Sequence, residues 1–358
     1  MPAGGHFMIP DAAMVSTASS PSREAPIGRR AFLGCAAALT VGLTGCAGGV
    51  ALPGKPGARA GETDGAFVMR DGALLPYRCW LPRGGPLRGL ILALHGFNDS
   101  RDAWEVPAAQ FTAAGYALYA PDQRGFGATP ERGLWPGVPR LVADASESAW
   151  HVRALHPGVP LVLMGESMGG AVLMCLATGP WAPMEARYVL VSPAVWGRAD
   201  MNVVYRSSLW LGAKLAPGLA LTGAPVSVTA SDNASAIIRL SRDPLTIHAT
   251  RLGTLRGLVD LMDAALASAA RFRAPGLFLY GGRDELVPKA ATADMWRRLP
   301  AGPAITLAYY PDDYHLMLRD LHRAVPIDDI RGWMSAPSSP LPSAADRAAL
   351  AWLANRTA

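Results

Sequence analysis

The chain has 358 residues, of which half are apolar and 17% are charged, a composition typical of a globular protein with a large core. The formal net charge of +5 comes from basic residues that do not form runs, so the sequence gives no support to nucleic-acid binding. The spacing of the four cysteines predicts neither a metal site nor a disulfide framework. The length allows two or three units, or one large α/β domain.

The first 45 residues predict an export signal that is not part of the fold. Arg29-Arg30 begins a pattern that resembles a twin-arginine signal, and an apolar run follows at 34–44. That run is shorter than the roughly 20 residues that span a bilayer. It ends in Leu43-Thr44-Gly45-Cys46, which resembles a bacterial lipobox, so Cys46 is the expected lipidated first residue of the mature chain. The alternative is an ordinary secretory signal with an incidental cysteine.

A lipidated Cys46 predicts a protein held in a bacterial cell envelope, on the periplasmic side of a membrane. Residues 46–65, rich in Gly, Pro and Ala, predict a flexible tether to the folded domain. Ala47 carries no charge that would signal retention in the inner membrane. By analogy with known lipoproteins, the outer membrane is the expected destination.

From residue 66 onward, short apolar runs alternate with helix-like segments. Two opening strands are expected at 67–70 and 74–81, joined by a turn at Asp71-Gly72. Further strands are expected at 87–94, 116–120, 161–164, 188–192, 275–280 and 305–310, and helices at 103–115, 138–155 and 171–178. This alternation predicts an α/β fold with a mostly parallel central sheet and helices on both faces.

The sequence Gly165-Glu166-Ser167-Met168-Gly169 follows a buried apolar run and precedes a helix-like segment. A strand, a tight turn and a helix are the context that a nucleophile elbow requires. The two glycines leave room where side chains would collide, so the Ser167 hydroxyl can stand clear at the head of the helix. The backbone N–H of Met168, at the N-terminus of that helix, is the expected donor to an oxyanion.

Several motifs together resemble the α/β-hydrolase superfamily, and within it the monoacylglycerol lipase and lysophospholipase family, with its serine aminopeptidase S33-like members. The motifs are His95-Gly96-Phe97, the loop 122–129, the elbow 165–170, Ser241-Arg242-Asp243-Pro244, Gly281-Gly282-Arg283-Asp284 and Tyr314-His315. The resemblance spans residues 74 to about 334. Two positions depart from the family pattern, since many members carry His in place of Glu166, and Asn98-Asp99 replace the usual Gly-Glu.

The resemblance implies that the loop after the strand at 87–94 supplies the second oxyanion donor, which is the N–H of Phe97. His95 lies beside a glycine at the end of this strand. The position favours a structural role, in which the imidazole holds the loop by hydrogen bonds, over a role as catalytic base.

A serine nucleophile needs a base and an orienting carboxylate, which follow in the chain order Ser, acid, His in this fold. Asp284 comes directly after the strand at 275–280, and His315 comes after the last strand, so they are the expected acid and base. Asp243 is the competing acid, but the Asp-Pro pair fits a helix boundary better. Four other histidines are expected in or beside helices as surface or packing residues: His151, His156, His248 and His322.

The stretch 196–272 breaks the strand–helix rhythm and contains several apolar helix-like pieces. It predicts a helical cap over the site, inserted between two parts of the core, 66–195 and 273–335. The apolar side chains of this cap could cover an acyl chain or lie against a membrane, although any one of them could equally pack the cap onto the core. Residues 336–358 predict a linker and a short terminal helix.

These patterns predict a serine hydrolase that cleaves carboxylic esters of lipids, with monoacylglycerols or lysophospholipids as substrates and with no cofactor or metal. One alternative is a general carboxylesterase or a hydrolase like proline aminopeptidase, acting with the same three residues. The other is a catalytically silent envelope lipoprotein that uses the fold for binding. Labelling by a fluorophosphonate separates an enzyme from a silent protein.

Overall fold

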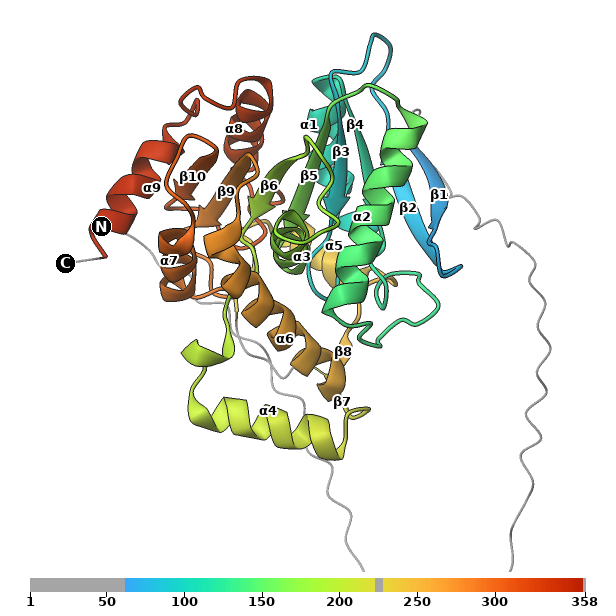
Figure 1. The fold of residues 1–358 in the computed structure, drawn as a ribbon. Coiled ribbons are helices and arrows are strands. Elements are labelled where there is room, and N and C mark those ends of the chain that lie inside the picture. The colour runs from blue at the N-terminus through green and yellow to red at the C-terminus, as the bar shows by residue number, and fades with distance from the viewer. Residues whose placement is uncertain (1–61, 223–227, 357–358) are drawn as a thin grey trace, which may run out of the picture. The chain divides into compact units, whose positions relative to one another are not determined.

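The computed structural model describes residues 62–222 and 228–356 (Figure 1). The chain divides into two units, Met1–Gly49 and Val50–Ala358, and all the described residues belong to the second. The predicted export signal and lipidated Cys46 therefore lie outside the described residues. No helix within 62–222 or 228–356 is both long enough and apolar enough to span a bilayer.

An eight-stranded sheet organises the second unit, with the strand order β1-β2-β4-β3-β5-β6-β9-β10. The opening hairpin strands β1 and β2 are antiparallel to their neighbours, and the other six strands are parallel. The strands are β1 Glu62–Val68, β2 Leu74–Trp80, β3 Gly89–Leu94, β4 Tyr116–Pro121, β5 Leu161–Glu166, β6 Arg187–Val191, β9 Gly276–Gly281 and β10 Ile305–Tyr310. The mostly parallel sheet predicted from the sequence is confirmed.

The predicted tether is too long at its C-terminal end. Its last residues, 62–65, belong to β1 and pair with Tyr77–Trp80 of β2. The composition of this stretch suggested flexibility, but ladder hydrogen bonds are made by the backbone and do not require apolar side chains.

The sheet is buried on both faces because alternate residues of each strand pack in opposite directions. In β3, Leu90, Leu92 and Leu94 belong to one apolar cluster, whereas Ile91 and Ala93 belong to another. The first cluster includes residues of α2 Val138–Leu155, α3 Met168–Ala177, α6 Leu252–Ser268 and α7 Lys289–Arg298. The second includes residues of η1 Arg101–Trp104, α1 Glu105–Ala113 and α8 Ala324–Ser335.

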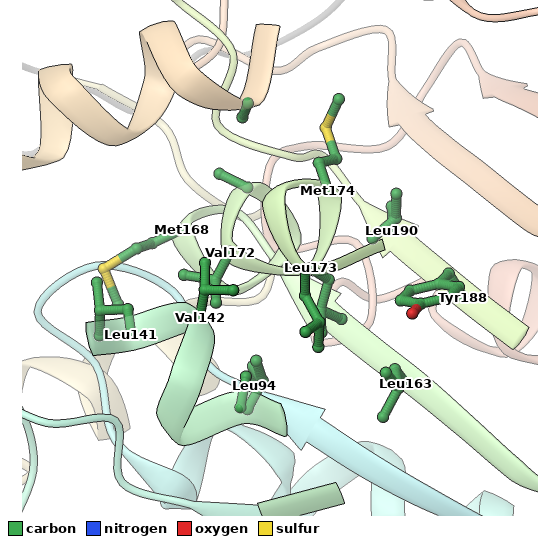
Figure 2. Packing of buried hydrophobic residues seen from close by; sticks show 14 of the residues in the cluster. Leu94, Leu141, Val142, Leu163, Met168, Val172, Leu173, Met174, Tyr188 and Leu190 are labelled. Atoms are coloured by element: carbon green, nitrogen blue, oxygen red, sulfur yellow. The ribbon is translucent and has the colours of Figure 1, made fainter. Parts of the chain in front are cut away.

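Helix α3 is the central helix of the first face. Figure 2 shows its apolar side chains beside Leu141 and Val142 of α2 and Leu94 and Leu163 of the sheet. The helix begins at Met168, three residues earlier than the sequence predicted, and therefore includes Gly169 and Gly170. Glycine is a poor helix former, but here the close approach of the strands favours residues without a side chain.

Between β6 and β9 the chain forms η2 Arg198–Asp200, α4 Val203–Leu215, α5 Ala234–Arg242, α6 and η3 Ala269–Arg271, with a small hairpin of β7 Ala220–Thr222 and β8 Ala249–Arg251. Two asparagines fix helix starts, since Asn202 accepts from the Tyr205 N–H and Asn233 from the Ala236 N–H. Helix α4 contacts α6 and lies on the far side of it from the sheet (Figure 1). Helix α6 also packs against α3, so part of this insertion contributes to the core.

The chain closes with α8, a connecting stretch and α9 Ala345–Ala354, which packs on β10. The predicted terminal helix is therefore present. Helices α7 and α8 were not predicted. The two cysteines in the described residues, Cys79 and Cys175, are both free.

Candidate active site

Ser167 occupies a strained turn between β5 and α3. Its backbone angles, φ 54° and ψ −113°, are rare for a residue with a side chain. Three backbone hydrogen bonds hold this conformation. The Ser167 N–H donates to the Val191 carbonyl at 2.9 Å, and the Ser167 carbonyl accepts from Ala171 and Ala194 at 3.0 Å each. The turn predicted at the elbow is therefore present and anchored to the neighbouring β6 and its loop.

The glycines of the elbow allow the close approach of α3 and the sheet. A Cβ at Gly165 would lie 2.5 Å from the Gly169 backbone, and a Cβ at Gly169 would lie 2.2 Å from the Leu94 carbonyl oxygen. Both separations are far below van der Waals contact. The motif glycines are thus required by packing between β3, β5 and α3.

Asp284 and His315 come from neighbouring parallel strands and meet at the carboxyl edge of the sheet. The Nδ1 of His315 lies 2.7 Å from Oδ2 of Asp284. The other carboxylate oxygen accepts from the N–H groups of Leu286 and Val287 at 2.8 and 2.9 Å. Both side chains are buried. The geometry orients the imidazole with Nδ1 toward the carboxylate and leaves Nε2 for another partner.

The environment of His315 favours its charged form. Burial lowers the pKa of this imidazole, but the charge and hydrogen bond of Asp284 outweigh burial, with a further contribution from Glu166. The net result is a pKa above the ordinary value for histidine. An imidazolium formed at His315 is thus stabilised by the adjacent carboxylate.

His95 has the structural contacts that its position in the sequence predicted. Its Nε2 accepts from the Gln123 N–H at 3.0 Å, which leaves Nδ1 to donate to the Gly96 carbonyl at 2.7 Å. The Gln123 side-chain amide in turn donates to the His95 carbonyl at 2.7 Å. Because the ring is fully buried, its pKa is lowered. A neutral ring that bridges two loops in this way holds them together.

The loop that contains Phe97 lies beside the elbow. A Cβ at Gly96 would be 3.4 Å from Cβ of Ser167, which places the two loops in direct contact. Among the described residues, neither the N–H of Phe97 nor that of Met168 has a hydrogen-bond acceptor. Unpaired backbone donors are uncommon inside proteins. Two of them in these adjacent loops, one at the N-terminus of α3, are suited to binding an anion.

Ser167 and His315 line one cavity of about 800 Å³. Phe97, Asp99 and Arg319 line it as well, while most of its wall is apolar. The larger apolar residues that the insertion between β6 and β9 contributes to the wall are Trp196, Met201, Leu209, Leu221, Leu240, Leu252, Leu255, Leu258, Val259 and Met262. The insertion therefore supplies most of the apolar wall of the cavity, whereas Ser167 and His315 lie at the edge of the sheet.

The competing acid, Asp243, follows the last residue of α5, as the Asp-Pro pair predicted. Its carboxylate accepts from the Leu245 N–H at 2.8 Å and from the Ser100 hydroxyl at 3.5 Å, and no hydrogen bond joins it to a histidine within the described ranges. His248 is exposed, as expected for a surface residue, but it lies in a bend just before β8 and not in a helix. Pairing of β8 with β7, a long-range interaction, gives this segment its local structure.

Arg319 is a site residue that the sequence did not predict. It lies four positions after His315 and donates to Asp99 at 2.8 Å and, by a second guanidinium nitrogen, to Glu166. Burial raises the pKa of Glu166, although the adjacent Arg319 works against this effect. Asp99 and Glu166 are positions where the chain departs from the family pattern, but neither departure identifies Arg319 as their partner.

The comparisons with known proteins agree with this geometry. A family model described as serine aminopeptidase, S33, matches residues 85–322. A monoacylglycerol lipase of Mycolicibacterium smegmatis is 28% identical over 283 residues, which cover 76% of this chain and 97% of that protein. A monoglyceride lipase of Homo sapiens is 28% identical over 265 residues, or 71% of this chain and 84% of that protein.

Among solved structures, a soluble variant of the Saccharomyces cerevisiae monoglyceride lipase, in complex with a substrate analogue, aligns with a TM-score of 0.65. It is 20% identical, and the alignment covers 75% of this chain and 94% of that one. A Paleococcus ferrophilus monoacylglycerol lipase aligns with a TM-score of 0.62 at 22% identity, covering 73% of this chain and 98% of that one.

The sheet order, the strained turn at Ser167 and the similarity to these structures define the chain as an α/β-hydrolase. The protein is therefore an enzyme of the ester hydrolase class. Because the family model matches most of the chain, the protein belongs to the serine aminopeptidase S33 family.

Proposed function

We propose that the protein hydrolyses monoacylglycerols through a covalent acyl-enzyme formed on Ser167. His315 takes the proton of the Ser167 hydroxyl as its oxygen attacks the ester carbonyl, and Asp284 orients and stabilises the resulting imidazolium. The tetrahedral intermediate collapses when His315 protonates the departing glycerol oxygen. Water then attacks the acyl-enzyme by the same route and releases the fatty acid. The hydrogen bond between His315 and Asp284 at a cavity shared with Ser167 is the observation that carries the proposal.

The N–H groups of Phe97 and Met168 are the proposed oxyanion donors. Negative charge develops on the carbonyl oxygen as the tetrahedral intermediate forms, and two fixed donors stabilise it without reorganising. The lack of an acceptor for either group within the described chain supports this assignment. Because both donors belong to the backbone, the proposal does not depend on side-chain chemistry at positions 97 and 168.

The substrate class follows from the shape and chemistry of the cavity. An apolar wall contributed by the insertion suits a single acyl chain, and the relatives from Mycolicibacterium smegmatis and Homo sapiens are a monoacylglycerol lipase and a monoglyceride lipase. The apolar wall also suits the acyl chain of a lysophospholipid. The two substrates differ in the headgroup, which carries a phosphate in the lysophospholipid.

One panel tests the substrate class. The purified residues 50–358 would be assayed against monoacylglycerols of graded chain length, lysophospholipids of the same chains, short soluble esters and a prolyl amide. We expect the highest kcat/KM for monoacylglycerols, with no turnover by the Ser167→Ala variant. A preference for lysophospholipids, for short esters or for the prolyl amide would reject the monoacylglycerol assignment. Absence of turnover on every substrate would favour the silent binding protein.

We propose further that Cys46 is lipidated and holds the enzyme on the periplasmic side of a bacterial outer membrane. The support comes from the sequence order of Arg29-Arg30, the apolar run 34–44 and Leu43-Thr44-Gly45-Cys46. Each buried CH₂ of an attached acyl chain contributes about 0.8 kcal/mol of membrane affinity. Two or three chains would hold the protein stably, near its lipid substrates.

Mass spectrometry of the mature N-terminus tests the anchor directly. We expect the mature chain to begin at Cys46 and to carry acyl chains, and the Cys46→Ser protein to leave the membrane fraction or remain unprocessed. Replacement of Arg29-Arg30 by two lysines should leave the precursor in the cytoplasm. An unmodified terminus at another residue would reject the anchor and leave the hydrolase proposal intact.

A further inference from the structure

Arg319 connects three segments that each carry one part of the proposed machinery. It lies in the loop of His315, and its guanidinium donates to Asp99, in the loop of Phe97, and to Glu166, the residue before Ser167. All three charged side chains are at least nine-tenths buried, with exposed fractions of 6%, 5% and 2% for Arg319, Asp99 and Glu166. The partners lie 220 and 153 positions away from Arg319 along the chain.

A buried cluster of three charged side chains is a poor way to stabilise a fold. Removing an arginine and two carboxylates from water has a high desolvation cost, and well-packed apolar residues can often replace a buried ion pair without loss of stability. A planar guanidinium does provide something that apolar residues do not, because its N–H groups fix the distance and direction of two carboxylates at once. The arrangement therefore favours a role in geometry.

Each partner of Arg319 is joined by a few bonds or hydrogen bonds to a residue of the proposed machinery. Asp99 receives a hydrogen bond from the Ser100 N–H at 2.8 Å, and its own N–H donates to the Gly96 carbonyl at 3.3 Å, which closes a turn around Phe97. Glu166 is covalently joined to Ser167. On the third side, the Arg319 N–H donates to the Leu316 carbonyl at 2.7 Å, which closes the turn after His315.

We propose that Arg319 is a positioning residue, which holds the oxyanion donor Phe97 and the nucleophile Ser167 in register with the base His315. This inference rests on the hydrolytic function proposed above. Arg319 acts through Asp99 and Glu166 and does not itself touch the reacting atoms. Its effect is therefore on the distance between reacting groups, to which rate is very sensitive, since a misplacement of about 1 Å can cost on the order of 100-fold.

Two variants of the purified residues 50–358 carry the test, with kcat, KM and Tm measured on a short soluble ester. Arg319→Lys keeps the charge but loses the planar fork. The triple variant Asp99→Asn, Glu166→Gln, Arg319→Met removes all three charges together and so leaves no unpaired ion. We expect the triple variant to fold with a Tm close to the parent and to lose about 100-fold in kcat, with little change in KM. Arg319→Lys should lose about tenfold in kcat.

Arg124→Met is the matched control. Arg124 is also buried and binds Asp144 by two guanidinium nitrogens, at 2.8 and 2.9 Å, but it does not line the cavity of Ser167. We expect this control to lower Tm and to keep kcat when assayed at a temperature where the protein is folded. A loss of kcat equal to that of the triple variant would show that any disturbance of a buried arginine is sufficient, and would overturn the inference.

Two other results would also overturn the inference. If Arg319→Lys and the triple variant keep the parent kcat, Arg319 only balances charge. If KM rises while kcat is unchanged, Arg319 contacts the substrate and is not a positioning residue. Should the triple variant fail to fold, Arg319→Lys decides the question alone. Turnover by Ser167→Ala, measured in the same assay, would instead reject the proposed function, so the two failures are distinguishable.

Discussion

The candidate active site, at the edge of the sheet, is held by more buried contacts than helix α4 of the insertion. Ser167 is fixed by three backbone hydrogen bonds, and the His315 and Asp284 side chains are almost fully buried. In α4, only Ala213 is buried, and Val204 and Leu215 are 72% and 74% exposed. The proposed catalytic residues are thus held by hydrogen bonds and by burial, whereas α4 presents apolar side chains to the outside.

The difference has a physical basis in the fold. Strained backbone at Ser167 persists only because the surrounding contacts determine it completely. Exposed apolar side chains have no such requirement, and a patch of them is suited to contact with another apolar surface. We therefore expect substitutions at the sheet to change the rate of the chemical step, and substitutions in α4 to change how the enzyme meets an aggregated substrate.

The largest effect is expected for Ser167→Ala. Removal of the nucleophile should lower kcat by about 10⁴- to 10⁶-fold and leave Tm close to that of the parent. Combination with His315→Ala should add little, because the two residues act as one unit. Esterase assays of the single and double variants check this. Retention of more than a few per cent of the activity by Ser167→Ala would contradict the assignment.

Asp284→Asn should lower kcat by about 10⁴-fold, because an amide does not stabilise the imidazolium and can hold the wrong tautomer of His315. Asp243→Asn is the matched control, since Asp243 has no hydrogen bond to a histidine among the described residues. We expect its kcat to fall much less. The reverse order of the two variants, at equal Tm, would assign the acid to Asp243.

Gly169→Ala should destabilise the fold, because the new Cβ would lie 2.2 Å from the Leu94 carbonyl oxygen. Overpacking of this kind costs about 1–3 kcal/mol, measurable as a lower midpoint of denaturant unfolding. Gly218→Ala, in the insertion, is the control, because no heavy atom lies within 4 Å of the new Cβ. Equal midpoints of unfolding for Gly169→Ala and Gly218→Ala would contradict the view that packing is tighter at the elbow than in the insertion.

The pH profile should depend on His315. In the proposed mechanism the neutral imidazole of His315 acts as the base, so kcat/KM should fall as the pH is lowered through the His315 pKa. Since Asp284 and Glu166 outweigh burial and raise this pKa, the acidic midpoint should lie above about 6.5, the usual value for histidine. A midpoint below 6.5 would contradict this electrostatic account.

Asp313→Asn serves as the control for the pH profile. Burial, with the nearby Asp320, Asp232 and Asp312, raises the pKa of Asp313 to about 7, so this carboxyl is the competing source of an acidic limb. We expect the acidic limb to persist in Asp313→Asn with its midpoint still above about 6.5. Loss of the limb in this variant would assign the titration to Asp313 and not to His315.

The smallest effect is expected in α4. Replacing both Val204 and Leu215 by serine should lower turnover of monoacylglycerol in vesicles by about threefold, because apolar area that could enter a lipid surface is lost. Turnover of a short soluble ester should not change, since neither residue lines the cavity. Parallel loss on both substrates would show that α4 supports the site itself.

Most of the sheet could be predicted because each buried parallel strand is a continuous apolar run. The runs 116–120 and 305–310 match β4 Tyr116–Pro121 and β10 Ile305–Tyr310 within one residue. Asp284 could be placed for a related reason, since it lies in the loop just after a strand whose end is marked by Gly281-Gly282. Patterns of this kind are local, so they can be recognised in the sequence without knowledge of the tertiary structure.

Arg319 could not be predicted from local patterns. Its partners are 153 and 220 positions away, and nothing in the residues around it indicates that its side chain is buried. The same holds for the hairpin of β7 and β8, whose strands of three residues pair across a long connection. In both cases the structure depends on contacts between distant segments, which a single sequence does not reveal.

Covalent labelling with a fluorophosphonate tests the central claim most directly. The purified residues 50–358 would be treated with the reagent, weighed intact and mapped by peptide mass spectrometry. The account predicts one adduct per chain, on Ser167, with no adduct in Ser167→Ala and much slower labelling in His315→Ala. An adduct on another residue, or labelling that persists in Ser167→Ala, would contradict it.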